Sequence, residues 1–171
     1  MWLNDAMITN TCYNSTDPNV GLSLNSDFST RKCYMMDTGF LITQTFLDGD
    51  YTENDLYKAV LFNKLNINEG MVMENVTAQI LRTNGHKLFF YSKSDRENKE
   101  NNMEIDFLIK DKENLKKISV IEVKSSTYKK HSSLDKFRNK DRIGNSYILY
   151  QKDLMIKDGV IHLPIYMSIF L

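Results

Sequence analysis

The chain is poor in cysteine and proline, and it carries no net charge. It has two cysteines and two prolines among 171 residues, and 22 basic side chains balance 22 acidic ones. Cys12 and Cys33 cannot form a disulfide framework or, alone, a four-ligand zinc site, which indicates ordinary thiols in a reducing compartment. No apolar run approaches the roughly 20 residues of a membrane span, and residues 1–10 lack the pattern of a secretory signal. We therefore expect a cytoplasmic protein with no membrane partner, of the size of one domain.

The balanced total charge hides an uneven distribution along the chain. Residues 1–84 carry five basic and ten acidic side chains, whereas residues 85–142 carry fifteen basic and ten acidic ones. From Lys124 to Arg142 the chain has seven basic residues against two acidic ones. A positive surface of this kind can meet phosphates. A solvated helix face explains the same run and is favoured when the run is taken alone, so the run matters only beside a chemical site.

The spacing of apolar residues predicts an α/β order of elements. Residues 1–30 read as loops and short strands, and residues 34–42 as a strand or turn that leads into a helix. Further helices are expected at 52–66, 68–84 and 132–141, and strands at 87–91, 103–109, 117–124, 146–150 and 160–163. The strands on either side of the last helix would form a parallel βαβ crossover. We expect residues 1–50 to be the end of an upstream module or a linker, and residues 51–171 to form the α/β domain.

Two of these strands carry charged residues where apolar ones would be the cheaper choice. Side chains alternate between the faces of a strand, so in residues 103–109 the apolar odd positions should face the core and Asp106 should face away. In residues 118–124, Glu122 and Lys124 should share one face. A buried charge that lacks its partner costs about 3–5 kcal/mol. The presence of Asp106, Glu122 and Lys124 on adjacent strands therefore needs a physical reason.

One reason is a divalent cation held between the carboxylates. Hard cations such as Mg²⁺ take oxygen ligands and keep several waters, and Asp106, Glu122 and the carbonyl of Val123 could supply three of them. A metal makes bound water a better nucleophile and neutralises charge on a phosphate. Lys124 could orient that water or stabilise the transition state. Glu74, on the preceding helix, could hold a metal-bound water or a second ion.

Other interpretations of these residues stay open. Asp106, Glu122 and Lys124 could form a structural salt-bridge cluster between neighbouring strands, or the scaffold of a site that has lost its activity. Glu74 could be a partly exposed helix carboxylate with one hydrogen bond. Glu104 lies at the start of its strand, where a salt bridge is the favoured role.

The charged strands resemble a known superfamily. Asp106, fifteen intervening residues and then Glu122-Val123-Lys124 are similar to the D…ExK core of the PD-(D/E)XK nucleases, and Glu74 matches the acidic residue that superfamily often has on its first core helix. The chain also resembles a domain of unknown function that follows the ATPase module in prokaryotic AAA-type ATPases. The segments that carry this second resemblance are Tyr34–Leu41, Gly70–Val76, Glu104–Phe107, Ile121–Ser125, Ser133–Phe137 and Leu163–Tyr166.

The resemblance implies a fold and a parent protein. The fold would be a restriction-endonuclease-like α/β domain with a mixed central sheet flanked by helices. The parent would begin with a P-loop ATPase module and a winged-helix segment, but this chain contains no G-x-x-x-x-G-K-[ST] run and cannot bind ATP by that device. Residues 1–6 look like the middle of such a protein. We therefore expect the chain to be a C-terminal fragment or an expressed domain of an ATPase.

Two functions follow from the sequence. The first is a Mg²⁺- or Mn²⁺-dependent phosphodiesterase that acts on DNA more readily than on RNA. Its catalytic residues would be Asp106, Glu122, Lys124 and Glu74, and five basic residues would grip the backbone: Lys129, Lys130, Lys136, Arg138 and Lys140. The alternative is a non-catalytic module that binds nucleic acid or assembles the ATPase. Whether the chain forms a homo-oligomer is left open by the sequence.

Overall fold

The computed structural model describes residues 2–46, 55, 58, 68–94, 102–111, 114, 116–125, 132–138 and 142–171. The helices are α1 (Trp2–Asp5), α2 (Thr38–Thr45), α4 (Glu69–Thr83), α5 (Ser132–Arg138) and the 3₁₀ helix η2 (Ile165–Phe170). The strands are β1 (Thr9–Ser15), β2 (Ser26–Met35), β3 (Phe89–Lys93), β4 (Met103–Lys110), β5 (Ile118–Val123), β6 (Ile143–Tyr150), β7 (Met155–Lys157) and β8 (Val160–Pro164).

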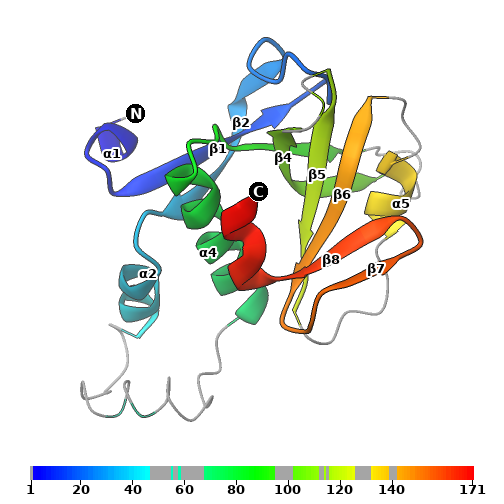
Figure 1. Cartoon of the computed structure of the whole chain (residues 1–171). Coiled ribbons are helices and arrows are strands. Elements are labelled where there is room, and N and C mark those ends of the chain that lie inside the picture. The colour runs from blue at the N-terminus through cyan, green and yellow to red at the C-terminus, as the bar shows by residue number, and fades with distance from the viewer. Residues whose placement is uncertain are drawn as a thin grey trace.

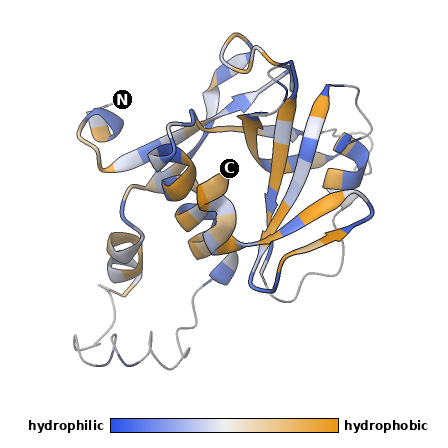
Figure 2. Ribbon diagram, in the orientation of Figure 1, coloured by the Kyte–Doolittle hydropathy of each residue, from blue (hydrophilic) through white to orange (hydrophobic). Residues whose placement is uncertain are grey.

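The strands form one mixed sheet flanked by helices, which confirms the predicted architecture at this level. Their order is β2-β1-β3-β4-β5-β6-β8-β7. The pairs β1–β3, β5–β6 and β6–β8 are parallel and the other pairs are antiparallel. Helix α4 and the C-terminal η2 lie together over one face, and α5 lies on the opposite face (Figure 1). The ribbons of β5 and β8 are largely orange in Figure 2, which marks their residues as mostly hydrophobic.

Most predicted elements are found close to their predicted bounds. The crossover from β5 through α5 to the parallel strand β6 is confirmed. Strand β7, an edge strand whose three residues are all exposed, was not predicted, because the apolar run at 154–156 is only three residues long and is flanked by charged residues. Most of the helix predicted at residues 52–66 lies outside the described residues, and so does the domain boundary predicted between residues 50 and 51. The same is true of most of the polar residues 92–102. The strands β1 and β2 belong to the same sheet as the rest of the chain.

Helix α4 begins and ends where its sequence predicts. The side chain of Asn68 accepts a hydrogen bond from the backbone N–H of Met71 at 3.3 Å, which satisfies a donor that the first helical turn leaves free. The helix stops at Asn84, and Gly85 follows with a φ of +86°, a left-handed conformation that favours glycine. Its buried face packs Leu81 against the sheet. This face also fixes the direction in which Glu74 points.

Strand β4 departs from simple alternation, which corrects the prediction that its odd positions all face one core. Phe89 pairs with Leu108 and Tyr91 with Ile105, so three steps along β4 match two steps along β3. This extra residue is a β-bulge. As a result Ile105 packs in the cluster under α5, whereas Phe107 packs in the cluster under α4. Asp106 lies within this bulge, between Ile105 and Phe107, and the bulge changes the direction of its side chain.

A buried amide clamps β2 onto α4. The side-chain oxygen of Asn75 accepts from the N–H of Met35 at 2.7 Å, and its amide nitrogen donates to the carbonyl of Met35 at 3.1 Å and to the hydroxyl of Thr38 at 2.9 Å. Asn75 is only 2% exposed. Strand β2 lies at the edge of the sheet and has a neighbouring strand, β1, on one side only. Backbone groups of Met35 on the open side therefore need a partner from elsewhere, which Asn75 supplies. The clamp therefore sets the position of β2 relative to α4.

We predict that Asn75→Ala lowers the free energy of unfolding by about 2–3 kcal/mol, because it leaves buried backbone groups of Met35 without partners. Urea unfolding measures the change. The control is Thr83→Ala, which removes one exposed, local hydrogen bond on the same helix and should cost no more than about 0.5 kcal/mol. Equal stabilities of the two variants would contradict the role of the clamp.

Candidate functional site

Asp106 spans the gap between β4 and β5. Backbone pairing of the two strands runs from Lys110 and Ile118 to Phe107 and Ile121. Beyond that point the carboxylate of Asp106 accepts a hydrogen bond from the N–H of Val123 at 2.8 Å. A side chain thus takes a donor that a regular ladder would give to the neighbouring backbone. This places Asp106 beside the end of the Glu122-Val123-Lys124 segment.

Glu122 and Lys124 form an ion pair at the end of β5. The ammonium nitrogen of Lys124 lies 3.2 Å from Oε2 of Glu122, whose side chain is 2% exposed. The backbone N–H of Lys124 donates to the carbonyl of Leu149 at 2.8 Å, so β6 holds this end of the strand in place. The predicted pairing of these two charges on one face of β5 is therefore present.

Glu74 reaches the same region from α4. Its Oε2 accepts a hydrogen bond from the hydroxyl of Tyr34 at 3.1 Å, and its charge raises the pKa of Asp106. It is thus more than an isolated surface carboxylate on the helix. The helix supplies negative charge to a site that β4 and β5 build.

Lys32 lies among three carboxylates and was not singled out by the sequence. Its ammonium nitrogen is 2.7 Å from Oε1 of Glu104, 3.7 Å from Oε2 of Glu74 and 3.8 Å from Oδ1 of Asp106. It also lies 5.3 Å from the centre of the Phe90 ring, within cation–π range. Burial lowers the pKa of Lys32, but the three carboxylates outweigh burial and the net pKa is raised. Glu104 makes the salt bridge that was expected of it.

One signal in the sequence pointed to Lys32. It lies two residues before Tyr34, so the two side chains share a face of β2, and Tyr34 is buried against Phe107. What the sequence could not supply is the pairing of β2 with β1, which sets Lys32 opposite Cys12 and above Phe90.

Asp106 is the carboxylate on which these charges converge. Burial first, and then the charge of Glu74, raise the pKa of Asp106 from 3.8 to about 7. The N–H of Val123 and the ammonium groups of Lys32 and Lys124 oppose this rise without cancelling it. The side chain is 15% exposed. The region therefore has more negative charge than its lysines neutralise, and Asp106 titrates near neutral pH.

The four predicted catalytic residues, together with Lys32 and Glu104, form one charged network, which we call the Asp106 network: Lys32, Glu74, Glu104, Asp106, Glu122 and Lys124. Among the predicted nucleic-acid contacts, Lys136 and Arg138 lie on α5, on the face of the sheet opposite α4. Arg138 lies 3.9 Å from Asp135 on the same helix. The other three, Lys129, Lys130 and Lys140, lie outside the described residues.

The oxygen donors of the network suit a hard cation, although no group of three or more metal-binding side chains is found among the described residues. Mg²⁺ commonly takes only one or two carboxylates and keeps its waters. Asp106, Glu122 and the carbonyl of Val123 are the donor set that the sequence predicts. The raised pKa of Asp106 comes first from burial and then from the charge of Glu74, and a cation beside these carboxylates would lower it.

The fold and the site define a mixed α/β domain with a buried charged network at the point where two strands separate. The chain belongs to the family described as Domain of unknown function (DUF4143), which matches residues 69–167. No curated protein and no solved structure matches the chain. Within the described residues, the helices are too short or too polar to cross a membrane.

The pKa of Asp106 predicts a pH-dependent stability. Because the folded-state pKa of about 7 lies above the ordinary 3.8, the folded chain binds more protons than the unfolded chain between pH 4 and 7. Stability should thus fall as pH rises through this window, by up to about 1.4 kcal/mol per pH unit from this group. Asp106→Asn keeps an oxygen for the Val123 N–H and should remove this contribution.

Urea unfolding of both proteins between pH 4 and 8 measures the two slopes. The control is Asp153→Asn, at an exposed position in the connection after β6, which should keep the wild-type slope. If Asp106→Asn and wild type show the same dependence on pH, Asp106 does not titrate in this range.

Proposed function

We propose that this chain is a nuclease-like module of the PD-(D/E)XK type that acts on nucleic-acid phosphodiesters. The observation that carries the proposal is the hydrogen bond from Val123 N–H to Asp106, which brings the aspartate of β4 to the Glu122–Lys124 pair of β5. An Asp on one strand beside a Glu-x-Lys on the next is the arrangement that this chemistry requires. The mixed sheet with helices on both faces is compatible with that fold.

Each residue of the network has a role in this proposal. Asp106 and Glu122, with the carbonyl of Val123, would hold Mg²⁺ or Mn²⁺. When bound, the metal would activate water and neutralise charge that develops on the phosphate. Lys124 orients the attacking water beside the phosphate and stabilises negative charge in the transition state. Glu74, hydrogen-bonded to Tyr34, faces the same site from α4 and assists.

The basic segment after β5 would bind the sugar-phosphate backbone, DNA rather than RNA. It includes Lys129, Lys130, Lys136, Arg138 and Lys140. Contacts with phosphates position a nucleic acid without reading its sequence. The parent protein would carry an AAA-type ATPase module upstream of this chain, and a homo-oligomer would bring several such sites together.

The proposal predicts metal-dependent cleavage of plasmid DNA that depends on Lys124. Lys124→Ala and Asp106→Asn should each lower the rate at least about a hundredfold, because the first removes an ammonium group that stabilises the transition state and the second removes a carboxylate that would hold the metal. The measurement is conversion of supercoiled plasmid in Mg²⁺ or Mn²⁺, followed on gels. The control is Lys157→Ala, an exposed lysine on the edge strand β7, which should keep wild-type activity. Cleavage that persists in Lys124→Ala would refute these roles.

Lys32 favours a second function. Its ammonium group already neutralises part of the charge of Glu74, Glu104 and Asp106 without a metal. A network balanced in this way can serve as a structural element of a non-catalytic module that binds nucleic acid or assembles the ATPase. Such a module needs no divalent cation.

A metal titration by calorimetry separates the two functions. The nuclease proposal predicts heat from binding Mn²⁺ in the wild type, and its loss in Asp106→Ala. Because the ammonium group of Lys32 lies near Asp106 and would repel a cation held there, Lys32→Met should bind Mn²⁺ more tightly, by about tenfold for one ammonium group removed at short range. Arg31→Met, at the exposed neighbouring position on β2, is the control. No heat that depends on Asp106 would favour the non-catalytic module.

A further inference from the structure

A second site lies at the opposite end of α4, where β1 and β3 separate. These two strands pair only at Tyr13 with Phe89 and at Asn14 with Phe90. N-terminal to that point the edge of β1 borders a cavity of about 300 Å³ instead of a strand. The backbone N–H of Thr11 on this edge is satisfied by the side chain of Asn4, at 3.2 Å. The sheet therefore leaves an opening that side chains line.

The wall formed by β1 has polar atoms without partners. Asn10 is 2% exposed, and its side-chain oxygen has no hydrogen-bond partner among the described residues. The same is true of the hydroxyl of Thr11, which also lines the cavity. Buried polar groups are nearly always hydrogen-bonded, and an exception calls for an explanation. A ligand that donates an N–H or O–H to this wall is such an explanation.

The rest of the lining is positive and aromatic. Arg82, in the last turn of α4, and Lys87, in the segment before β3, both line the cavity, and no carboxylate does so among the described residues. Both are exposed, and neither makes an ion pair with a described residue. Phe28 is 67% exposed and packs edge-on against Tyr13, with ring centres 5.3 Å apart. A ring face is thus available beside two cations.

We infer that this cavity binds one nucleotide, with its base against Phe28 and Tyr13 and its phosphate between Arg82 and Lys87. The base edge supplies hydrogen-bond donors to Asn10 and Thr11, as amide side chains pair with base edges elsewhere. Aromatic rings stack on bases of any type, and arginine suits phosphate oxygens. The volume is at the lower limit of ligand pockets, which fits one nucleotide.

The nucleotide belongs to an unpaired strand or is a free mononucleotide, and both share this chemistry. The first case rests on the proposed function, because the strand would be the one that the Asp106 network acts on. Arg82 lies eight residues from Glu74 on α4, about 12 Å along the helix axis. One single strand could therefore reach from the cavity to the network.

The test is binding of a short fluorescent single-stranded oligodeoxythymidylate, followed by anisotropy in EDTA. Without a metal, binding is read separately from cleavage, so a failure of the nuclease proposal leaves this result intact. The variant Arg82→Gln/Lys87→Gln should weaken binding at least about tenfold. It should also lower the slope of log affinity against log salt by about 0.7 for each phosphate that the variant no longer neutralises. Phe28→Ala should weaken binding by roughly five- to a hundredfold.

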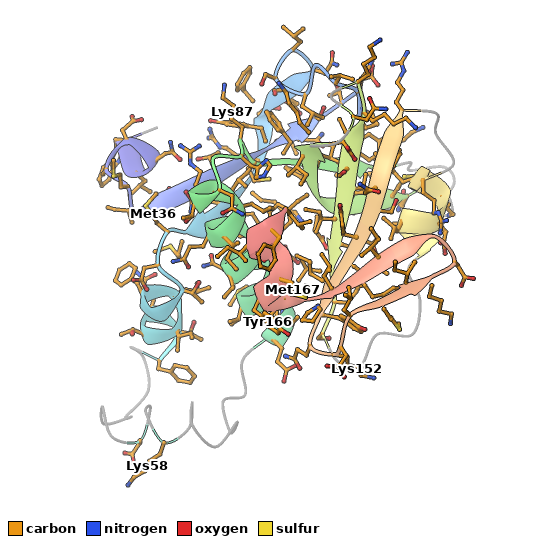
Figure 3. All side chains as sticks on the ribbon, viewed as in Figure 1. Met36, Lys58, Lys87, Lys152, Tyr166 and Met167 are labelled. Atoms are coloured by element: carbon orange, nitrogen blue, oxygen red, sulfur yellow. The ribbon has the colours of Figure 1, made fainter. Side chains whose placement is uncertain are left out.

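The matched control removes the same charge elsewhere. Lys152→Gln/Lys157→Gln changes two exposed lysines at the far end of the molecule, where Figure 3 shows Lys152 well separated from Lys87. This pair should keep wild-type affinity. If it weakens binding as much as the cavity pair, the effect is general electrostatics and the inference is wrong.

Competitors identify the ligand. Adenosine monophosphate is compared with an unlabelled single strand at the same total nucleotide concentration. Equal displacement of the fluorescent oligonucleotide by the two competitors supports a free nucleotide as the ligand, and weaker displacement by adenosine monophosphate supports a strand. Inorganic pyrophosphate that competes equally well, or unchanged binding in Phe28→Ala, would show an anion site without a base and overturn the assignment. No binding of any of these probes would overturn it as well.

Discussion

The central constraint of this structure is the crowding of several carboxylates, most of them at least partly buried, around Asp106. Isolated carboxylates are strongly disfavoured away from water, yet Glu74 lies close enough for its charge to oppose ionisation of Asp106. Lys32 and Lys124 are each placed to reduce this repulsion, one from β2 and one from the end of β5. The arrangement holds only if β2, α4, β4 and β5 keep their relative positions. The Asn75 clamp and the bulge in β4 serve that requirement, because the first fixes β2 on α4 and the second turns Asp106 toward both.

The parts of this fold that were predictable are those encoded by local chemistry. The Asn68 cap and the Asn84-Gly85 stop define α4 within the sequence itself, and the alternation of Glu122 and Lys124 correctly predicts that the two charges meet. The position of Asp106 beside the Glu122-Val123-Lys124 segment was predicted, but from a wrong face assignment, since a bulge depends on the partner strand. Lys32 was missed for a related reason. Its neighbours come from strands far away along the chain, and pairing between distant strands leaves little trace in a single sequence.

The two candidate functions differ in how they use the same ammonium group. In a metal-dependent site, Lys32 competes with the cation for the carboxylates that face α4, and its replacement strengthens metal binding. In a non-catalytic module, Lys32 completes the neutralisation and a metal adds little. The pKa of about 7 at Asp106 bears on this choice, because it shows that Lys32 and Lys124 together do not offset the burial of Asp106 and the charge of Glu74. A purely structural cluster would gain stability from an uncharged residue at this position. Retention of Asp106 against that gain is the physical argument for a role beyond stability.

The contribution of the N-terminal strands changes what the functional unit is. The family match begins at Glu69, the first residue of α4, whereas Lys32 and Tyr34 lie on β2 and Asn10 and Thr11 on β1. Residues outside the matched segment thus complete the charged network and form one wall of the cavity. Because β1 and β2 pair with each other and with β3, a chain cut before α4 would lose both sites along with an edge of the sheet. Strand β1 lines the cavity and pairs with β2, which carries Lys32 and Tyr34, so the same N-terminal hairpin contributes residues to both places.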